Sequence, residues 1–516
     1  MTKDRQNYII IFISCLLTVL LYQYSVFHYT NGQMGVPLDD TWIHFRFAEN
    51  FANGHFFEFN IGEPTSGTTS PLWVILLAAF SFISSDYIFN SIFLSSFFYI
   101  LSCIFIYKIA REIFSIETYR VKFPESYSLV VALLSIFAGR LAWSASSGME
   151  TMMFTFFCII GVHYHVKDLI AGRFSLSPGI FFALATASRP EGYLIFLLFI
   201  IVSAFEVFYK NFQKSDFKKI LISILLFIVV TIPYPIFSYY SNGSFSPNTY
   251  SGQGGYLRFI PNLEYIKVIF TFFFRDNIIV TSLFLYSVFF YFSRLRKFFR
   301  EYKHVNLIFL WAIVLPVASS ILIPNWRHHG RYMMPLIPFI NFIGVFMFSN
   351  IVVFFSERKF QNIFSKKITV FSLTVFSFVY FVIFFIAIGK NTSNINDQQV
   401  KMAYWIIDNI PESETIAVND IGAIGFITKR YIVDMAGLIT PEILRYRTYQ
   451  WHDNVDSTRA LLERNNVKYL IIYEHWFKNL LNEWEGMLKH IHSEILEENT
   501  ICGGEEKKVF KVNFGK

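Results

Sequence analysis

Charged residues are scarce in this sequence of 516 residues. Asp, Glu, Lys and Arg together make up 16% of it, whereas hydrophobic residues make up 54% and phenylalanine alone occupies 63 positions. An ordinary soluble domain carries about 25% charged residues. The shortage of charge therefore excludes a typical soluble protein and indicates a chain that lies in a membrane for most of its length.

Cysteine is also rare, and its spacing excludes two kinds of site. The four cysteines, Cys15, Cys103, Cys158 and Cys502, lie far apart. A disulfide framework or a structural zinc site needs cysteines at closer, paired spacings. The chain also lacks GxGxxG and other nucleotide-phosphate motifs. The cofactor stays unknown at this point: a divalent cation is one option, although the sequence has no clear metal motif.

Long apolar stretches recur from Tyr8 to Ile388, whereas no long apolar stretch follows Gly389. The first stretch follows Lys3 and Arg5, is longer than a signal-peptide core and lacks a small-residue cleavage site, so we interpret it as an uncleaved signal anchor. Each span needs roughly 20 apolar residues. The pattern predicts an α-helical polytopic membrane module over 1–389 with about 11 transmembrane helices, followed by a soluble α/β domain over 390–516.

Basic residues collect in alternate short loops, which sets the orientation of the chain. Loops rich in Lys and Arg stay in the cytoplasm, so the net charge of +7 is explained by topology and predicts no nucleic-acid binding. The N-terminus is then cytoplasmic, and loop 28–70, the loops near 140–148, 188–191, 241–264 and 323–331, and the tail face outward. The basic groups are Lys3/Arg5, Lys108/Arg111/Arg120/Lys122, Lys167/Arg173, Lys210/Lys214/Lys218/Lys219, Arg294/Arg296/Lys297/Arg300/Lys303 and Arg358/Lys359/Lys366/Lys367.

The apolar stretch 71–108 must carry the chain from outside to inside, which requires an odd number of crossings. We therefore assign 88–107 as a full span. Residues 71–85 are too short to cross comfortably and are expected to form a re-entrant or interfacial helix on the outer face.

Loop 28–70 is longer than a spacer and begins a helix near Pro37. On that helix Asp39 shares a polar stripe with Arg46, Asn50 and Asn53, whereas Asp40 lies on the side of His44. Either aspartate could simply cap the helix. Three more outward points carry charges at membrane depth, where such groups are costly unless they serve a function. These points contain Glu150, then Arg189 and Glu191, then His328 and Arg331.

Carboxylates and arginines from separate segments thus map to one side of the membrane. Arginines can hold a lipid phosphate in a bidentate manner and stabilise the charge it gains as a sugar leaves. A carboxylate can take the proton of an acceptor hydroxyl. For Arg189 and Arg331 the alternative is that each merely extends toward the interface.

The sequence resembles the GT-C superfamily of membrane glycosyltransferases, and within it the branch of terminal arabinofuranosyltransferases and related bacterial proteins. The matching residues follow the order of the chain. They are Leu38-Asp39-Asp40 through Arg46, Gly54, Phe59-Asn60-Ile61-Gly62-Glu63, Gly67 through Trp73, Ser147 through Thr151, Arg189 through Gly192, Ser246 through Tyr250, Gly330-Arg331-Tyr332 with Pro335 and Pro338, Asn419 through Gly425, and Asp434 through Leu438.

This resemblance implies a helical membrane module with juxtamembrane helices in the first outer loop and a periplasmic C-terminal domain. It marks Asp39 and Asp40 as catalytic, with Asp39 the first choice for the base and Asp40 capping the helix or orienting the acceptor. The donor would be a polyprenyl-phosphate sugar, transferred with inversion to an envelope glycan, lipid or protein at a bacterial inner membrane. The expected substrate-binding residues are Arg46, Glu63, Glu150, Arg189, Glu191, Tyr250, His328 and Arg331.

The tail has the pattern of an α/β domain. It predicts helices over 398–409 and 456–464, and strands over 415–418, 431–433, 469–473, 491–495 and 509–512. The turn Asn419-Asp420-Ile421-Gly422 follows a strand, where open α/β sheets often bind ligands. A plain turn in a lid or an acceptor-binding domain is equally compatible with this pattern.

Other classes of protein also fit this membrane setting. A ligase of the O-antigen type or a phosphoethanolamine transferase would act in the same membrane setting, but the second needs a metal cluster and a nucleophilic hydroxyl that the sequence does not show. A lipid-linked glycan flippase or transporter, or a non-catalytic envelope-assembly protein, is the remaining alternative. Transporters tend to have internal repeats, and this chain has no visible repeat.

Overall fold

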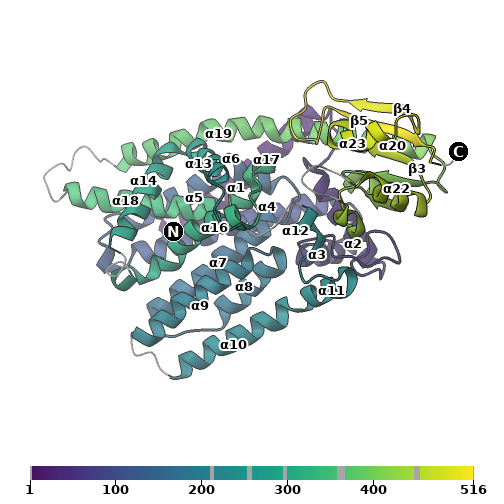
Figure 1. Ribbon diagram of the computed structural model, residues 1–516. Helices are drawn as coiled ribbons and strands as arrows, with labels where there is room; N and C mark the ends of the chain where they lie inside the picture. Colours follow the sequence, from purple (N-terminus) through teal and green to yellow (C-terminus); the bar gives the residue numbers. More distant parts are fainter. Residues whose placement is uncertain are drawn as a thin grey trace. The chain divides into compact units, whose positions relative to one another are not determined.

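The computed structural model describes residues 3–209, 214–252, 258–294, 299–356, 366–446 and 454–514 (Figure 1). The chain divides into two compact units. The helical unit comprises Met1–Gln23, Ile92–Ile232 and Leu257–Ile386, and the mixed unit comprises Tyr24–Ser91, Pro233–Tyr256 and Ala387–Lys516. Of the basic residues that set the orientation, Lys210, Arg296, Lys297, Arg358 and Lys359 lie outside the described residues.

The described residues contain seven helices that are long and apolar enough to cross a membrane, and a bent pair makes up to eight. This confirms a polytopic α-helical membrane protein, whereas the count of about eleven spans stays a prediction. The bent pair joins α5 (Pro124–Ile136) and α6 (Gly139–Ala145) at 62°. The seven spans cover Lys3–Tyr29, Tyr87–Phe114, Thr151–Ala171, Asp216–Asn242, Lys303–Leu322, Arg327–Val353 and Thr374–Asn409.

Several consecutive helices of the helical unit are joined by short connections, such as residues 189–191 between α8 (Ser177–Ser188) and α9 (Gly192–Tyr209). The helix α8 ends at Arg189 because Pro190 follows, and the residue before a proline favours the extended backbone that Arg189 adopts. The helices not yet bounded are α1 (Lys3–Tyr29), α4 (Tyr87–Phe114), α7 (Thr151–Ala171), α10 (Lys214–Thr231), α13 (Leu263–Asp276), α14 (Ile278–Ser293), α16 (Asn306–Leu322), α17 (Arg327–Gly330), α18 (Ile337–Ser356) and α19 (Lys366–Asn394).

The helices of the mixed unit are mostly short. Helix α3 has 11 residues, so it is about 16 Å long and shorter than the hydrocarbon core of a bilayer. This length agrees with the prediction that residues 71–85 do not cross the membrane alone. The short helices are α2 (Asp39–Ala52), α3 (Pro71–Ser81), α11 (Pro233–Asn242), α12 (Asn248–Gly252), the π-helix η4 (Ile395–Val400), α20 (Lys401–Asn409), α21 (Gly422–Thr428), α22 (Val455–Arg464) and α23 (Lys478–Glu483).

A five-stranded sheet forms the centre of the tail and confirms its α/β class. The strand order is β2-β1-β3-β5-β4, with β1 parallel to β2 and β3, and β5 antiparallel to β3 and β4. Buried Val433, Leu470 and Phe510 contribute to the core between sheet and helices. The strands are β1 (Thr415–Val418), β2 (Ile432–Asp434), β3 (Val467–Ile472), β4 (Leu488–Ile495) and β5 (Glu506–Val512).

The boundary of the two predicted domains falls at 389/390, inside one continuous helix, α19. The mixed unit also joins loop 28–70 to the tail, although more than 300 residues separate them in sequence. Whether 1–389 and 390–516 behave as separate domains stays a prediction.

Candidate functional site

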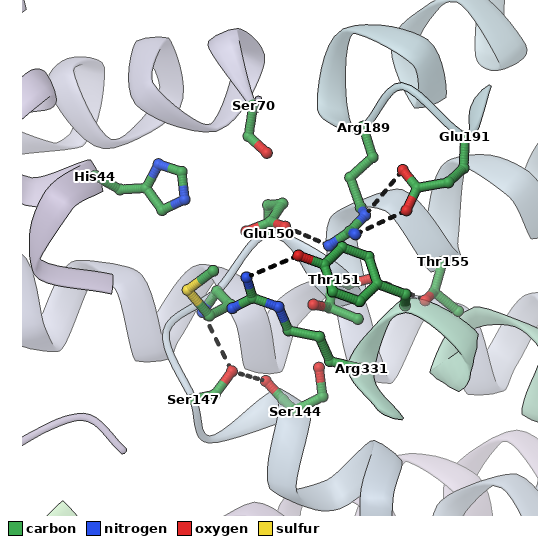
Figure 2. Close-up of polar contacts among 12 residues, drawn as sticks. His44, Ser70, Ser144, Ser147, Glu150, Thr151, Thr155, Arg189, Glu191 and Arg331 are labelled. Atoms are coloured by element: carbon green, nitrogen blue, oxygen red, sulfur yellow. Dashed lines mark hydrogen bonds and ion pairs between the residues drawn. The ribbon is translucent and has the colours of Figure 1, made fainter. Parts of the chain in front are cut away.

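Arg189 of the helical unit lies between two carboxylates. Its Nη1 donates to Glu150 Oε1 at 2.6 Å, its Nη2 to Glu191 Oε1 at 2.8 Å, and its Nε to Glu191 Oε2 at 3.3 Å (Figure 2). The arginine is only 3% exposed. Removing one member of such a buried ion pair typically costs about 3–5 kcal/mol, because the other charge stays buried without compensation. The cluster therefore holds together the segments that follow α8 and precede α7.

Tyr332 joins Arg331 to this cluster. The guanidinium carbon of Arg189 lies 4.6 Å from the centre of the Tyr332 ring, and that of Arg331 lies 5.3 Å from it. Arg331 also donates from Nη2 to the Tyr332 hydroxyl at 3.4 Å. The structure thus brings together four residues predicted from separate segments, Glu150, Arg189, Glu191 and Arg331. Tyr332 was part of the motif but was not predicted as a site residue.

The backbone before Arg331 forms a left-handed turn. His328, His329 and Gly330 have φ values of 51°, 61° and 68°. For residues other than glycine this conformation costs about 1–2 kcal/mol each, and it persists only where surrounding contacts impose it. One such contact is the bond from Arg140 Nη1 to the His329 carbonyl at 3.3 Å. His328, a predicted substrate contact, occupies the first position of this turn.

The buried pair Arg140 and Asp276 was missed by the sequence analysis. Arg140 Nε donates to both Asp276 carboxylate oxygens, at 2.9 and 3.0 Å. Each residue is a charge at the end of an apolar helix, which is the signal that identified Arg189. Because Arg140 also bonds the strained turn, the pair helps to position Arg331.

Asp39 of the mixed unit binds the N-terminus of α21. Its Oδ2 accepts from the Gly422 amide at 2.7 Å and its Oδ1 accepts from the Ala423 amide at 2.8 Å. Burial, and then the charge of Asp420, raises the pKa of Asp39 to about 7. The two N–H groups and the positive helix end favour the ionised form and partly offset this rise. Neither aspartate is the N-cap of α2, since that position is Leu38, so the capping expectation is wrong.

Lys507 is a buried cation close to this contact. Its Nζ donates to Gln399 Oε1 and to the Asn419 carbonyl, both at 2.7 Å, and to the Asp420 carbonyl at 3.3 Å. Burial lowers the pKa of Lys507, and the negative charges of Asp420 and Asp39 oppose that shift. The motif Asn419-Asp420 was noted in the sequence, but nothing in the final strand distinguished Lys507 from its neighbours.

The predicted polar stripe of α2 binds the backbone of its own loop. Arg46 Nε donates to the Phe59 carbonyl at 3.2 Å, and Asn50 Nδ2 donates to the same carbonyl at 3.0 Å. The predicted contact Glu63 accepts from the Tyr431 hydroxyl at 2.9 Å. In the described structure, Arg46 and Glu63 therefore hold loop 28–70 together and attach it to the tail.

The opposite side of α2 carries Asp40 and His44. His44 Nδ1 lies 3.4 Å from Thr68 Oγ1, which in turn accepts from the Ser70 amide at 3.1 Å. Asp40 is half-buried and lies one helical turn before His44. Helical periodicity predicted that Asp40 and His44 lie on another face of α2 than Asp39, and the structure agrees.

Tyr250 belongs to α12, which a polar network attaches to the tail. The neighbouring Asn248 donates from Nδ2 to Thr65 Oγ1 at 3.3 Å and to the Leu438 carbonyl at 3.1 Å. Asp434 shapes the loop that carries Leu438, since its carboxylate accepts from backbone amides there, and burial raises the pKa of Asp434 to about 6. Tyr250 itself is half-buried.

Within the described ranges, no group of three or more His, Cys, Asp or Glu residues is placed so that it could hold a metal ion. The divalent cation that the sequence left open stays a prediction.

Comparisons with known proteins bear on the fold. Residues 393–509 match the family model described as a domain of unknown function, DUF8728. No curated protein gives a significant match to the sequence.

Solved structures match over nearly the whole chain. ArnT from Cupriavidus metallidurans bound to undecaprenyl phosphate has a TM-score of 0.58 and 11% identity, and the match covers 98% of this chain and 97% of ArnT. The apo state of the same ArnT has a TM-score of 0.57 and 12% identity, with 98% of each chain covered. The mycobacterial arabinofuranosyltransferase AftD has a TM-score of 0.49 and 11% identity, covering all of this chain and 40% of AftD. The chain therefore has the fold of ArnT over nearly its whole length.

Proposed function

We propose that the protein is a glycosyltransferase that moves a sugar from a polyprenyl-phosphate carrier to an envelope glycan, lipid or protein. The observation that carries this proposal is the ArnT-like fold over 98% of the chain. One of the ArnT structures holds undecaprenyl phosphate, which supports a polyprenyl-phosphate donor here. The orientation inferred from basic loops supports a reaction on the extracytoplasmic side of a bacterial inner membrane.

Arg331 is the residue best suited to contact the donor phosphate. The charge of Arg189 is already balanced by two carboxylates, Glu150 and Glu191, so a phosphate would have to displace them. Arg331 is buried beside this cluster, and its guanidinium can donate two parallel hydrogen bonds to a phosphate. As the bond between the anomeric carbon and the phosphate oxygen breaks, this oxygen gains charge that Arg331 stabilises.

Asp40 is the better candidate for the base. Both carboxylate oxygens of Asp39 accept backbone N–H bonds, and the residue is 9% exposed, so an acceptor hydroxyl has little access to it. In an inverting displacement the acceptor oxygen bonds to the anomeric carbon on the face opposite the phosphate. Its proton passes to the Asp40 carboxylate, and the electron pair of the broken bond leaves with the polyprenyl phosphate.

The roles of the two aspartates can be separated by amide substitution. Asp40→Asn removes the basic oxygen and should lower the transfer rate about 100-fold or more while leaving thermal stability unchanged. In Asp39→Asn an amide NH₂ replaces one of the two carboxylate oxygens that accept backbone N–H bonds. One of these hydrogen bonds is lost, so the substitution should mainly lower the stability of the protein, by about 1–3 kcal/mol. The measurement is the rate of sugar transfer from undecaprenyl-phosphate sugars by each variant in proteoliposomes. The control is Asp408→Asn, a substitution of an exposed residue.

If Asp39→Asn is inactive at wild-type stability and Asp40→Asn is active, Asp39 is the base, as the family resemblance implies. If both variants transfer sugar at the wild-type rate, the proposed mechanism is wrong.

A further inference from the structure

Ser70 occupies the N-cap position of α3 and yet does not cap the helix with its side chain. A serine at this position usually accepts a hydrogen bond from an amide of the first turn. Here the Ser70 carbonyl accepts from the amides of Trp73 and Val74, at 3.0 and 3.2 Å. The Ser70 hydroxyl is fully buried, and it has no hydrogen-bond partner among the described residues. Figure 2 shows this hydroxyl turned away from its helix.

Two more buried donors near the same loop lack partners in the described part of the chain. They are the hydroxyl of Thr249, which is 8% exposed, and the indole nitrogen of Trp73, which is fully buried. Thr249 follows Asn248, which bonds Thr65 at the start of the loop, and Trp73 lies one helical turn after Ser70. Buried polar groups nearly always have a hydrogen-bond partner. Three buried groups without a partner around one loop therefore indicate that a bound molecule supplies it.

The loop Thr65–Ser70, which we call the hydroxyl loop, is held in place by hydrogen bonds from neighbouring segments. Ser238 donates to the Ser66 hydroxyl at 3.0 Å, and the Tyr234 hydroxyl donates to the Thr68 carbonyl. The side-chain amides of Asn242 and Asn248 donate to the hydroxyls of Ser66 and Thr65, and His44 Nδ1 lies 3.4 Å from the Thr68 hydroxyl. The loop is therefore fixed before any ligand arrives, which lowers the entropic cost of binding.

The chemistry of these groups favours a neutral polyhydroxyl ligand over a phosphate. A phosphate would use the free amides of a helix N-terminus, but Pro71 has no N–H and the amides of Trp73 and Val74 are bonded to Ser70. The hydroxyls of Ser70 and Thr249 can each donate and accept, and an indole N–H donates, as the alternating hydroxyl groups of a sugar require.

We propose that Ser70, Thr249 and Trp73 form a subsite for a sugar ring, within the mixed unit. The subsite deepens the proposed function, on which it rests, by naming residues that recognise the glycosyl group. The sugar is that of the donor or that of an acceptor glycan, since both present the same hydroxyl chemistry.

Binding can be measured without transfer. Saturation-transfer NMR of full-length protein in nanodiscs, with methyl glycosides of pentoses and hexoses as probes, should give a signal for at least one sugar. Ser70→Ala combined with Thr249→Val should weaken that binding about tenfold, because the sugar hydroxyls lose their partners. The single variant Thr249→Ser keeps both Ser70 and a hydroxyl at position 249. It should therefore bind the sugar with nearly the wild-type affinity. Ser81→Ala is the matched control, because its hydroxyl bonds the Ala78 carbonyl at 2.7 Å within the same helix.

Transfer kinetics then identify which sugar binds. An increase of about tenfold in KM for the undecaprenyl-phosphate sugar, with an unchanged KM for the acceptor, assigns the subsite to the donor, and the reverse assigns it to the acceptor. Absence of any glycoside signal in the wild type, or wild-type binding by the double variant, would overturn the proposal. Wild-type protein that binds glycosides through these residues but transfers no sugar would uphold the subsite and reject the proposed function.

Discussion

Two buried arginines of the helical unit lie in different surroundings. Arg189 bonds two carboxylates from both ends of its guanidinium, so its geometry serves the fold of this region. Arg331 follows a left-handed turn that costs free energy, and strain of this kind is usually retained where a side chain must be aimed. Arg189 therefore holds the cluster together, and the strained turn before Arg331 is consistent with the proposed contact of Arg331 with the donor phosphate.

Lysine substitutions should distinguish these roles. Arg331→Lys keeps the charge but cannot form the bidentate fork, so transfer should fall about 10- to 100-fold with little loss of stability. Arg189→Lys should instead lower the thermal midpoint, because one ammonium cannot bond Glu150 and Glu191 as the guanidinium does. Arg327→Lys, an exposed change in the same segment, is the control. Wild-type transfer by Arg331→Lys would reduce Arg331 to an interface anchor.

At the residue scale, sequence periodicity could separate Asp39 from Asp40 but could not assign their roles. The faces of a helix follow from spacing alone. The partner of Asp39, Gly422, lies 383 residues away, and no local pattern shows such a contact. The same limit explains why Lys507 was missed, since its significance comes only from the buried groups around it.

Among the elements, α2 and α21 form a close junction inside the mixed unit. A Cβ atom at Gly422 would lie 2.0 Å from the backbone oxygen of Asp39, a contact that only glycine avoids. The Asp39 carboxylate lies over the amides of the same helix end. The absence of a side chain at Gly422 lets α2 approach α21 closely, and this approach allows the Asp39 carboxylate to bond the α21 amides.

Gly422→Ala should therefore destabilise the protein by about 1–3 kcal/mol, because the clash is with backbone that cannot rotate away. The measurement is the thermal midpoint of purified protein in detergent. The matched control is Gly252→Ala, where a Cβ would meet the end of the Leu438 side chain at 3.2 Å and the leucine can move. Equal midpoints for the two variants would show that the junction is loose.

Elements with strong local signals could be predicted, and those stabilised by distant partners could not. The strand Thr415–Val418 was predicted with the bounds it has, and the helix Val455–Arg464 within one residue. Helix α21 was not predicted, because glycine lowers helix propensity by about 1 kcal/mol. Its seven residues form a helix with the help of Asp39, which binds its first amides.

At the scale of the whole molecule, composition was enough to predict a membrane module and an α/β tail. Apolar runs and the alternating patterns of the tail are local properties of the sequence. The mixed unit is different, because it combines residues 24–91, residues 233–256 and the tail. Its formation depends on contacts such as that of Asn60 with the backbone of Ile432, at 2.9 and 3.1 Å, which composition does not encode.

The central claim is that this ArnT-like chain transfers a sugar from a polyprenyl-phosphate donor. The most direct measurement uses purified protein in proteoliposomes with a panel of radiolabelled undecaprenyl-phosphate pentoses and hexoses and an envelope lipid extract as acceptor. We expect the label to move to the acceptor with inverted anomeric configuration, as undecaprenyl phosphate is released. Movement of the intact donor across the bilayer, without transfer of label from any donor of the panel, would contradict the account and indicate a transporter.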